Sequence, residues 1–198
     1  MISSNASPSA WQPVLDFWFL PAADPGHGKA RPEWFRKDAA FDAAVRQRFG
    51  DAIAGAVDGA FVEWDRDPRG ALARIILLDQ FTRNALRGTP GAFSGDARAL
   101  AAARAMVDGG RDRLLVPVER SFVYLPFEHA EDQAMQERAV ALFGALAAEP
   151  ELDGIAEYAI RHCDIIARFG RFPHRNHILG RVSTPEEIEF LKLPGSGF

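Results

Sequence analysis

The chain has 198 residues, of which 47% are hydrophobic and 25% are charged, and its formal net charge is −4. This composition is typical of a globular protein in water and excludes a largely disordered chain. The acidic balance excludes the general attraction of a basic surface for nucleic acid or an anionic membrane, and no apolar run approaches the roughly 20 residues of a spanning helix.

Cys163 is the only cysteine, which excludes an internal disulfide and fits a reducing cytoplasm. Its expected role is that of a half-buried structural thiol. Residues 1–10 lack the basic segment and apolar core of a signal peptide, and we expect them to be frayed. A chain of this length can build one core, so we expect a single all-α domain over residues 1–198, with a coil tail at 194–198.

Apolar residues recur at helical spacing in about seven segments. Asp67 and Pro68 provide an N-cap followed by proline at the first helical position, while Thr184, Pro185 and Glu187 form a capping box. Pro126 interrupts the longest segment because its nitrogen cannot donate a hydrogen bond, so we expect a kink or a break there. The expected helices span residues 11–19, 38–57, 67–86, 94–108, 117–148, 152–169 and 184–191.

No stretch alternates polar and apolar residues with period two, so no strand is predicted. About seven helices with short connections predict antiparallel helix pairs packed in layers. No exact internal repeat is visible at a period of 30 to 50 residues. The fold class expected from the residues alone is therefore all-α.

Three of the predicted helices carry polar residues on the face that their apolar residues place in the core. Burial of such groups costs several kcal/mol each unless they find partners, so they predict a shared polar pocket. Asp79 and Arg83 are four residues apart and can pair along one helix. The polar residues are Asp79 and Arg83 in the helix 67–86, His129, Asp132, Gln133 and Gln136 in the helix 117–148, and His162 in the helix 152–169.

The segment 168–181 concentrates four arginines, two histidines and an asparagine between glycine and proline residues. Gly170 is expected to end the preceding helix in the left-handed conformation, and Pro173 prevents the helix from continuing. We therefore expect a fixed cationic turn that covers the polar pocket. The side chains expected to point at Asp79, His129 and Asp132 are Arg171, His174, Arg175 and Asn176.

Three stretches match the motifs of a known family. They are Leu-Leu-Asp-Gln-Phe-Thr-Arg-Asn at 77–84, Tyr-Leu-Pro-Phe-Glu-His-Ala-Glu-Asp at 124–132 and Arg-Phe-Gly-Arg-Phe-Pro-His-Arg-Asn at 168–176. With these motifs the chain resembles the domain-of-unknown-function 924 family over nearly its whole length. The resemblance implies a bacterial all-α protein with a tetratricopeptide-like superhelix, without an established activity or cofactor. Ala130 departs from the serine expected after the histidine, which puts a role for a hydroxyl there in doubt.

The first hypothesis for function is binding of a small anion or an acidic peptide end, because the planar arginine side chain can hold a carboxylate or phosphate with two hydrogen bonds. No cofactor or metal is expected at this pocket, and the oligomeric state is left open. The expected ligand-binding residues are Asp79, Arg83, Asn84, His129, Asp132, Gln136, His162, Arg171, His174, Arg175 and Asn176.

The second hypothesis is a hydrolase-like enzyme, in which Asp132 or Asp79 orients His129 as general base and arginines stabilise a developing negative charge. His129 and Asp132 would lie side by side in a regular helix. A metal variant would recruit His162, His174 or His177 with Asp132, although nearby arginines would repel a cation. In the third hypothesis the polar network only ties helices together, and the chain acts as a scaffold for a protein partner.

Overall fold

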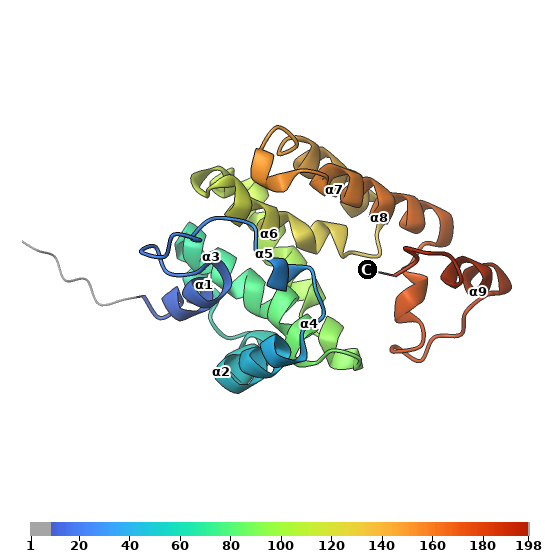
Figure 1. The fold of residues 1–198 in the computed structure, drawn as a ribbon, viewed down its shortest axis with the longest axis horizontal. Coiled ribbons are helices and arrows are strands. Elements are labelled where there is room, and N and C mark those ends of the chain that lie inside the picture. The colour runs from blue at the N-terminus through green and yellow to red at the C-terminus, as the bar shows by residue number, and fades with distance from the viewer. Residues whose placement is uncertain (1–8, 198) are drawn as a thin grey trace, which may run out of the picture.

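A computed structural model describes residues 9–197, and every regular element among them is helical, as predicted (Figure 1). Residues 1–8, which belong to the segment expected to be frayed, and Phe198 lie outside this range. The α-helices are α1 (Gln12–Phe19), α2 (Ala39–Asp58), α3 (Pro68–Ile75), α4 (Thr82–Ala85), α5 (Asp96–Asp108), α6 (Pro117–Glu128), α7 (Gln133–Gly144), α8 (Ile155–Phe169) and α9 (Pro185–Leu191).

Short 3₁₀ turns separate several α-helices, and one π-helical segment joins two of them. The π segment, η3, continues α3 directly into α4. The 3₁₀ turns are η1 (Pro32–Trp34), η2 (Val62–Arg66), η4 (Pro90–Phe93), η5 (Arg111–Leu114), η6 (Pro150–Leu152) and η7 (Pro173–Arg175), and the π segment is η3 (Ile76–Phe81).

The helix ends follow the local signals in the sequence. Asp67 accepts hydrogen bonds from the backbone N–H groups of Arg69 and Gly70, and Thr184 forms the expected capping box with Glu187. Gly170 ends α8 with φ 68°, the left-handed conformation that glycine adopts without steric cost. These ends are fixed by residues close in sequence, which is why they could be predicted.

The core is centred on α3 and η3, which are buried along most of their length. Side chains from α1, α2 and α6 surround them. Trp18, for example, contacts the rings of Phe81 and Phe122 at centroid distances of 5.6 and 5.5 Å. Edge-to-face and offset contacts of this kind add to the free energy of burial. Asp79 of η3 is therefore held in the centre of the core.

Two further groups of helices lie outside this core: α7 with α8, and the segment from η7 to α9 (Figure 1). α7 packs against both α6 and α8, and the ribbon shows α7 and α8 side by side. The segment from η7 to α9 forms the opposite end of the molecule from α1, and the C-terminal end of the chain returns towards the middle (Figure 1). Ser196 in this tail is buried and donates a hydrogen bond to the Leu191 carbonyl, so the expected coil at 194–197 is a series of turns packed on the molecule.

The predicted helix 117–148 is broken after Pro126, at residues 129–132. Gln136 bridges the break, because its side-chain amide donates to the carbonyls of Glu128 (2.6 Å) and Ala130 (2.7 Å). Asp132 caps the new helix by accepting from the Met135 N–H at 3.0 Å. His129 and Asp132 are therefore not neighbours on one regular helix, and the expectation that they lie side by side was wrong.

Two smaller corrections concern which helix faces are buried. In α5 helical spacing predicts a core face of Leu100, Ala103 and Val107. Ala103 is buried, together with Ala99, Ala102 and Met106, whereas Leu100 and Val107 are only partly buried. In α8 the side chain of Tyr158 is 54% exposed although its spacing placed it on the core stripe. A helical wheel gives only the direction in which each side chain leaves the helix, so tertiary packing decides which apolar side chains are covered.

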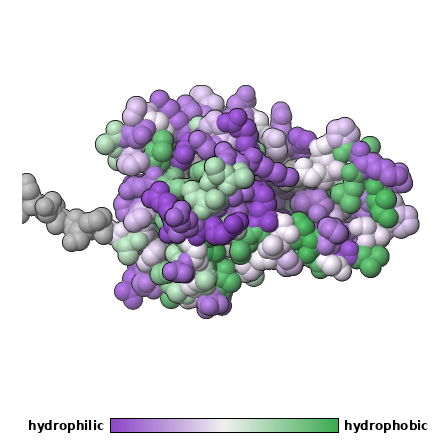
Figure 2. Space-filling view, turned by 60° about the horizontal axis from the view of Figure 1, so that its bottom comes forward, coloured by the Kyte–Doolittle hydropathy of each residue, from purple (hydrophilic) through white to green (hydrophobic). Residues whose placement is uncertain are grey.

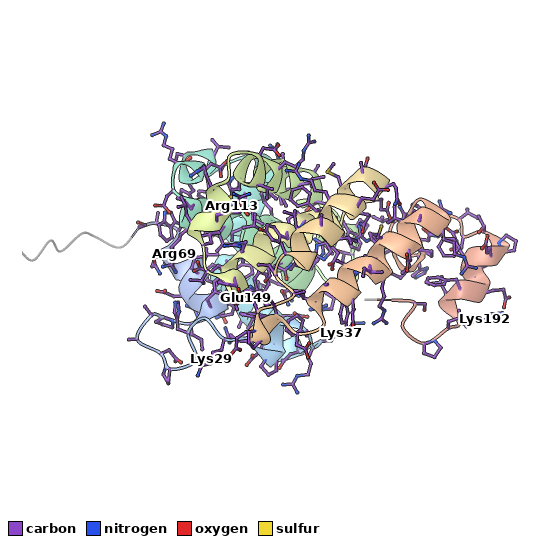
Figure 3. All side chains as sticks on the ribbon, turned by 90° about the horizontal axis from the view of Figure 1, so that it is seen from above. Lys29, Lys37, Arg69, Arg113, Glu149 and Lys192 are labelled. Atoms are coloured by element: carbon purple, nitrogen blue, oxygen red, sulfur yellow. The ribbon has the colours of Figure 1, made fainter. Side chains whose placement is uncertain are left out.

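The surface mixes hydrophilic and hydrophobic residues, with several hydrophobic groups at the end that carries α9 (Figure 2). The chain has three lysines. Lys29 and Lys37 lie at separate places in the N-terminal part of the molecule, and Lys192 lies at the α9 end (Figure 3). Clustered cations therefore have to be arginines. Within residues 9–197 no helix is both long and apolar enough to cross a membrane.

Candidate functional site

The site begins with the π-helical segment η3, which the sequence did not predict. π-helical turns are rare and occur most often at functional sites. Here the segment carries Asp79, whose exposed fraction is 0%, in the middle of apolar residues that are equally buried. Thr82 donates its hydroxyl to the Leu78 carbonyl at 2.8 Å and holds the end of the segment. A carboxylate in such surroundings must be stabilised by specific partners.

Asp79 has three polar partners. Nδ1 of His129 lies 2.8 Å from Asp79 Oδ1, Arg83 Nη1 lies 3.2 Å from the same oxygen, and Gln80 donates to Oδ2 at 2.6 Å. Burial by itself would raise the pKa of Asp79, but the charge of Arg83 and the contact with His129 outweigh it and lower the pKa well below its usual range. Asp79 is therefore ionised at neutral pH.

The contact with Asp79 fixes the tautomer of His129. An ionised carboxylate can only accept a hydrogen bond, so Nδ1 of His129 must carry a proton, and Nε2 of the neutral ring then holds a lone pair. Burial, followed by the charge of Arg83, lowers the pKa of His129, which keeps the ring neutral at pH 7. Its side chain is 16% exposed, so the ring reaches the surface. Asp79 and His129 thus form an oriented pair of the kind that accepts protons in enzymes.

A second cluster adjoins this pair and contains two arginines with one shared carboxylate. Arg83 donates to both oxygens of Asp96, at 2.7 and 3.1 Å, whereas the closest approach of Arg175 to Asp96 is 3.5 Å. The guanidinium of Arg175 lies between the rings of Phe93 and Phe172, at 4.8 and 4.5 Å from their centroids. Arg83 also lies over Phe93, at 5.6 Å.

Arg175 is 6% exposed, and its guanidinium makes no hydrogen bond with any residue of the range 9–197. Burial and the neighbouring charge of Arg83 lower its pKa to about 10, so it is still charged at neutral pH. A buried cation that makes no hydrogen bond, and whose nearest carboxylate oxygen is 3.5 Å away, is unfavourable unless stacking or a ligand compensates for the lost hydration.

The two remaining histidines of the predicted pocket lie close to this cluster. Burial lowers the pKa of His162 to about 3 and that of His174 to about 4, and in both cases the charge of Arg175 lowers it further. His162 Nδ1 contacts the Tyr158 carbonyl at 2.9 Å, which requires a proton on that nitrogen. Both rings are therefore neutral at pH 7 and cannot supply positive charge.

The structure thus brings together Asp79, Arg83, His129, His162, His174 and Arg175 from the set predicted by sequence. The other members have partners elsewhere, and the expectation that Arg171 and Asn176 point at Asp79 was wrong. The residues outside the cluster are Asn84, which donates to Asp42, Asp132, which caps α7, Gln136, which donates to backbone carbonyls, and Arg171 and Asn176, which both donate to Glu187.

Glu131, in the break between α6 and α7, holds the cationic turn in place. It accepts from both terminal nitrogens of Arg181, at 2.6 and 2.9 Å, and from the backbone N–H of Phe172 at 2.8 Å. Phe172 is the ring on which Arg175 stacks. The broken helix therefore positions the turn through one carboxylate, and a continuous helix could not present it in this way.

Sequence reasoning missed two acidic residues of the cluster. Asp96 opens α5, and acidic residues are so common in the first turn of a helix that nothing distinguished it. Glu128 is 4% exposed at the end of α6. The available signal was its spacing of three residues from Leu125, on the helix face already assigned to the core.

Neither of two cavities in the structure includes the cluster. One of about 260 Å³ is lined mainly by α5, α6 and α7, around Asp112 and Tyr124, and one of about 220 Å³ lies between α8 and α9 near Phe190. In the described part of the chain no group of three or more His, Cys, Asp or Glu residues could hold a metal ion. The cluster is mostly buried and reaches the surface at Asp96 and Arg83, whose side chains are 25% and 18% exposed.

Comparison with known proteins places the chain in a family. No curated protein matches it. Among solved structures, a protein of unknown function from Agrobacterium tumefaciens is similar, with 40% sequence identity and a TM-score of 0.79 over 92% of this chain and 96% of that chain. The sequence pattern of the family described as "Bacterial protein of unknown function (DUF924)" matches residues 14–195. The chain therefore belongs to the DUF924 family, as its motifs had indicated.

Proposed function

We propose that this protein binds a small anion, a phosphate or a carboxylate group, between Arg83 and Arg175 and beside His129. The observation that carries the proposal is the guanidinium of Arg175, which is buried, charged and without a hydrogen-bond acceptor in residues 9–197. An oxyanion would supply the missing acceptor and a closer counter-charge than Asp96, which lies 3.5 Å away.

The surroundings of Arg175 favour this class of ligand. The guanidinium of Arg175 lies over the rings of both Phe93 and Phe172, and these aromatic contacts leave its N–H groups to bind a carboxylate or phosphate. Arg83 brings a second cation to the same ring of Phe93. Two guanidinium groups held close together repel each other, and an anion between them removes that repulsion.

The test is a thermal-denaturation series with inorganic phosphate, sulfate and malonate for the wild type, Arg175→Met and Arg171→Met. At ten times its Kd an anion should stabilise the wild type by about 1.4 kcal/mol, or roughly 3–6 °C in Tm. Arg175→Met should lose this shift. Arg171→Met is the matched control, because Arg171 is engaged with Glu187 and should affect the Tm of the free protein but not the shift.

Two results would count against the proposal. One is an absence of any shift with all three anions in the wild type, and the other is an equal shift in the wild type and in Arg175→Met. An acidic peptide with a free C-terminal carboxylate, compared with its amidated form, distinguishes a peptide end from a free anion. A larger shift with the free carboxylate than with malonate would identify the peptide end.

A second function, proton transfer in a hydrolase-like reaction, is favoured by the geometry of Asp79 and His129. The Asp79 contact at 2.8 Å orients the ring and leaves the Nε2 lone pair to accept a proton from water, while the arginines are near enough to stabilise negative charge on a substrate. The test measures turnover of p-nitrophenyl phosphate and p-nitrophenyl acetate by the wild type and His129→Gln. Turnover that is lost in His129→Gln supports this function, and equal rates for the two proteins contradict it.

A further inference from the structure

Glu128 is an acidic side chain for which the anion site described above has no use. It is the last residue of α6, it is 4% exposed, and it directly precedes His129. One carboxyl oxygen, Oε1, lies 3.5 Å from His162 Nδ1, and the other, Oε2, is buried and makes no hydrogen bond with any residue in the described range. A buried carboxyl with an unpaired oxygen calls for a functional explanation.

Among residues 9–197 no cation balances Glu128. His162 is its only neighbour within ion-pair distance in the described range, and the Nδ1 proton of that ring is committed to the Tyr158 carbonyl. Gln136, which packs on the same helix end, donates to the Glu128 backbone carbonyl and not to its side chain. The carboxyl therefore resembles those buried acids that keep their proton at neutral pH.

The groups around the end of α6 come from five elements. Within residues 9–197 their charges at neutral pH cancel, because Arg83 and Arg175 face two aspartates, Glu131 is paired with Arg181, and the histidines are neutral. The groups are Asp79 of η3, Arg83 of α4, Asp96 of α5, His162 of α8, His174 and Arg175 of η7, and, in or next to the break between α6 and α7, His129, Glu131 and Gln136.

Burial, followed by the charge of Asp79, raises the pKa of Glu128 to about 8. At pH 7 Glu128 is therefore protonated while Asp79 is ionised. Two carboxyls whose pKa values are shifted in opposite directions are characteristic of functional sites.

We propose that Glu128 sets the charge of the anion site, which accepts an anion while this carboxyl holds its proton and rejects it once the proton has left to solvent. The proposal rests on the proposed function. Loss of the proton adds one carboxylate to a site whose other charges are balanced, so the same two arginines then face an excess of negative charge. The unpaired oxygen of Glu128 is buried, so this side chain acts on the anion through its charge and not by direct contact. Glu128 is in this sense a specificity-determining residue.

The test measures the Kd of sulfate by calorimetry between pH 6.5 and pH 9, because sulfate keeps its charge throughout this range. For the wild type we expect the Kd to rise about tenfold between pH 7 and pH 9, as a linked group with a pKa near 8 requires. Glu128→Gln mimics the protonated acid and should bind with the wild-type affinity at pH 7 and keep that affinity to pH 9.

Glu119→Gln is the matched control, since Glu119 is another buried glutamate of α6 but is paired with Arg69. It should follow the wild-type pH profile. A wild-type Kd that does not change with pH, or a Glu128→Gln profile as steep as that of the wild type, overturns the role of Glu128 while leaving the anion site standing. Absence of sulfate binding at every pH overturns both proposals.

Unfolding by urea gives a second readout that needs no ligand. Burial raises the pKa of Glu128 to about 8 in the folded protein, whereas the unfolded chain loses this proton near the ordinary pKa of 4.5. Stability due to this group is therefore fully present below pH 4.5 and falls as the pH rises to 8. Glu128→Gln should become progressively more stable than the wild type across this window, with a constant difference above it. A difference that is independent of pH overturns the inference.

Discussion

Arg171 and Arg175 lie four residues apart in the same cationic turn, yet they have opposite environments. Arg171 donates to both oxygens of Glu187, at 2.6 and 2.8 Å, and to the Val182 carbonyl. Arg175 is more deeply buried, but its nearest carboxylate oxygen is 3.5 Å away and already accepts from Arg83. One arginine ties α9 to the turn, and the other remains available for a ligand.

The difference shows that the partners of a buried charge carry more functional information than its position. Both arginines occur in the most recognisable motif of the sequence, and both were expected in the site. The hydrogen bonds divide the turn into two halves. The structural half contains Arg171 and is held by Glu187, and the other half contains Arg175 and is directed at Asp79 and Asp96. The hydrogen bond from Arg171 lowers the pKa of the Glu187 carboxyl to about 2, as expected for the structural half. The following four substitutions test this division.

The largest effect is expected for Asp79→Ala, on the side directed at the ligand. It leaves Arg83 and His129 without the carboxylate at the centre of the core. Removing one partner of a buried ion pair costs roughly 3–5 kcal/mol, and we expect about 3 kcal/mol because Arg83 keeps Asp96. Urea unfolding measures it, with Asp108→Ala at the exposed pair with Arg138 as control. A loss below about 1 kcal/mol would mean that the Asp79 pair contributes little.

Glu131→Gln should break the link between the two halves. The substitution weakens the paired hydrogen bonds to Arg181 and the bond from the Phe172 N–H, and we expect a loss of about 1–2 kcal/mol. Phe172 then no longer holds Arg175 in place, so the anion-induced Tm shift should decrease as well. Glu186→Gln, at an exposed pair with Arg168, serves as the comparison. Lost stability with an intact anion shift would show that Arg175 is positioned without Glu131.

Asp132→Ala tests a residue that belongs to neither half. Asp132 caps α7, and loss of such a cap costs about 1 kcal/mol. Chemical denaturation should detect this loss, while anion binding and any turnover that depends on His129 should stay at wild-type levels. A specific loss of turnover in Asp132→Ala would restore this residue as the partner of His129.

The smallest effect is expected for Arg168→Ala. Arg168 pairs with Glu186 on the outside of the structural half, where the two side chains are 51% and 62% exposed. Exposed pairs contribute about 0–1 kcal/mol, so the change in unfolding free energy should be no more than about 0.5 kcal/mol. A much larger loss, measured under the same conditions as Asp79→Ala, would show that the structural half depends on the outer pair as well as on Glu187.

The sequence by itself determined the all-α fold class, most helix ends and the presence of buried polar groups. These features depend on residues within one or two turns of each other, such as Asp67 with Pro68 or Thr184 with Glu187. The same local periodicity placed Asp79 and His162 on core faces, and both are buried. The motifs also indicated the family to which the chain belongs.

Only the tertiary structure decided which buried groups meet. The break after Glu128 turned Asp132 into a helix cap and left Asp79, 50 residues away in the sequence, as the partner of His129. Helical spacing gives the face of a helix on which a side chain lies, but the partner across that face depends on how distant segments pack. For this reason Asp96 and Glu131 could not be assigned to the site in advance, and the division between Arg171 and Arg175 could not be read from their common motif.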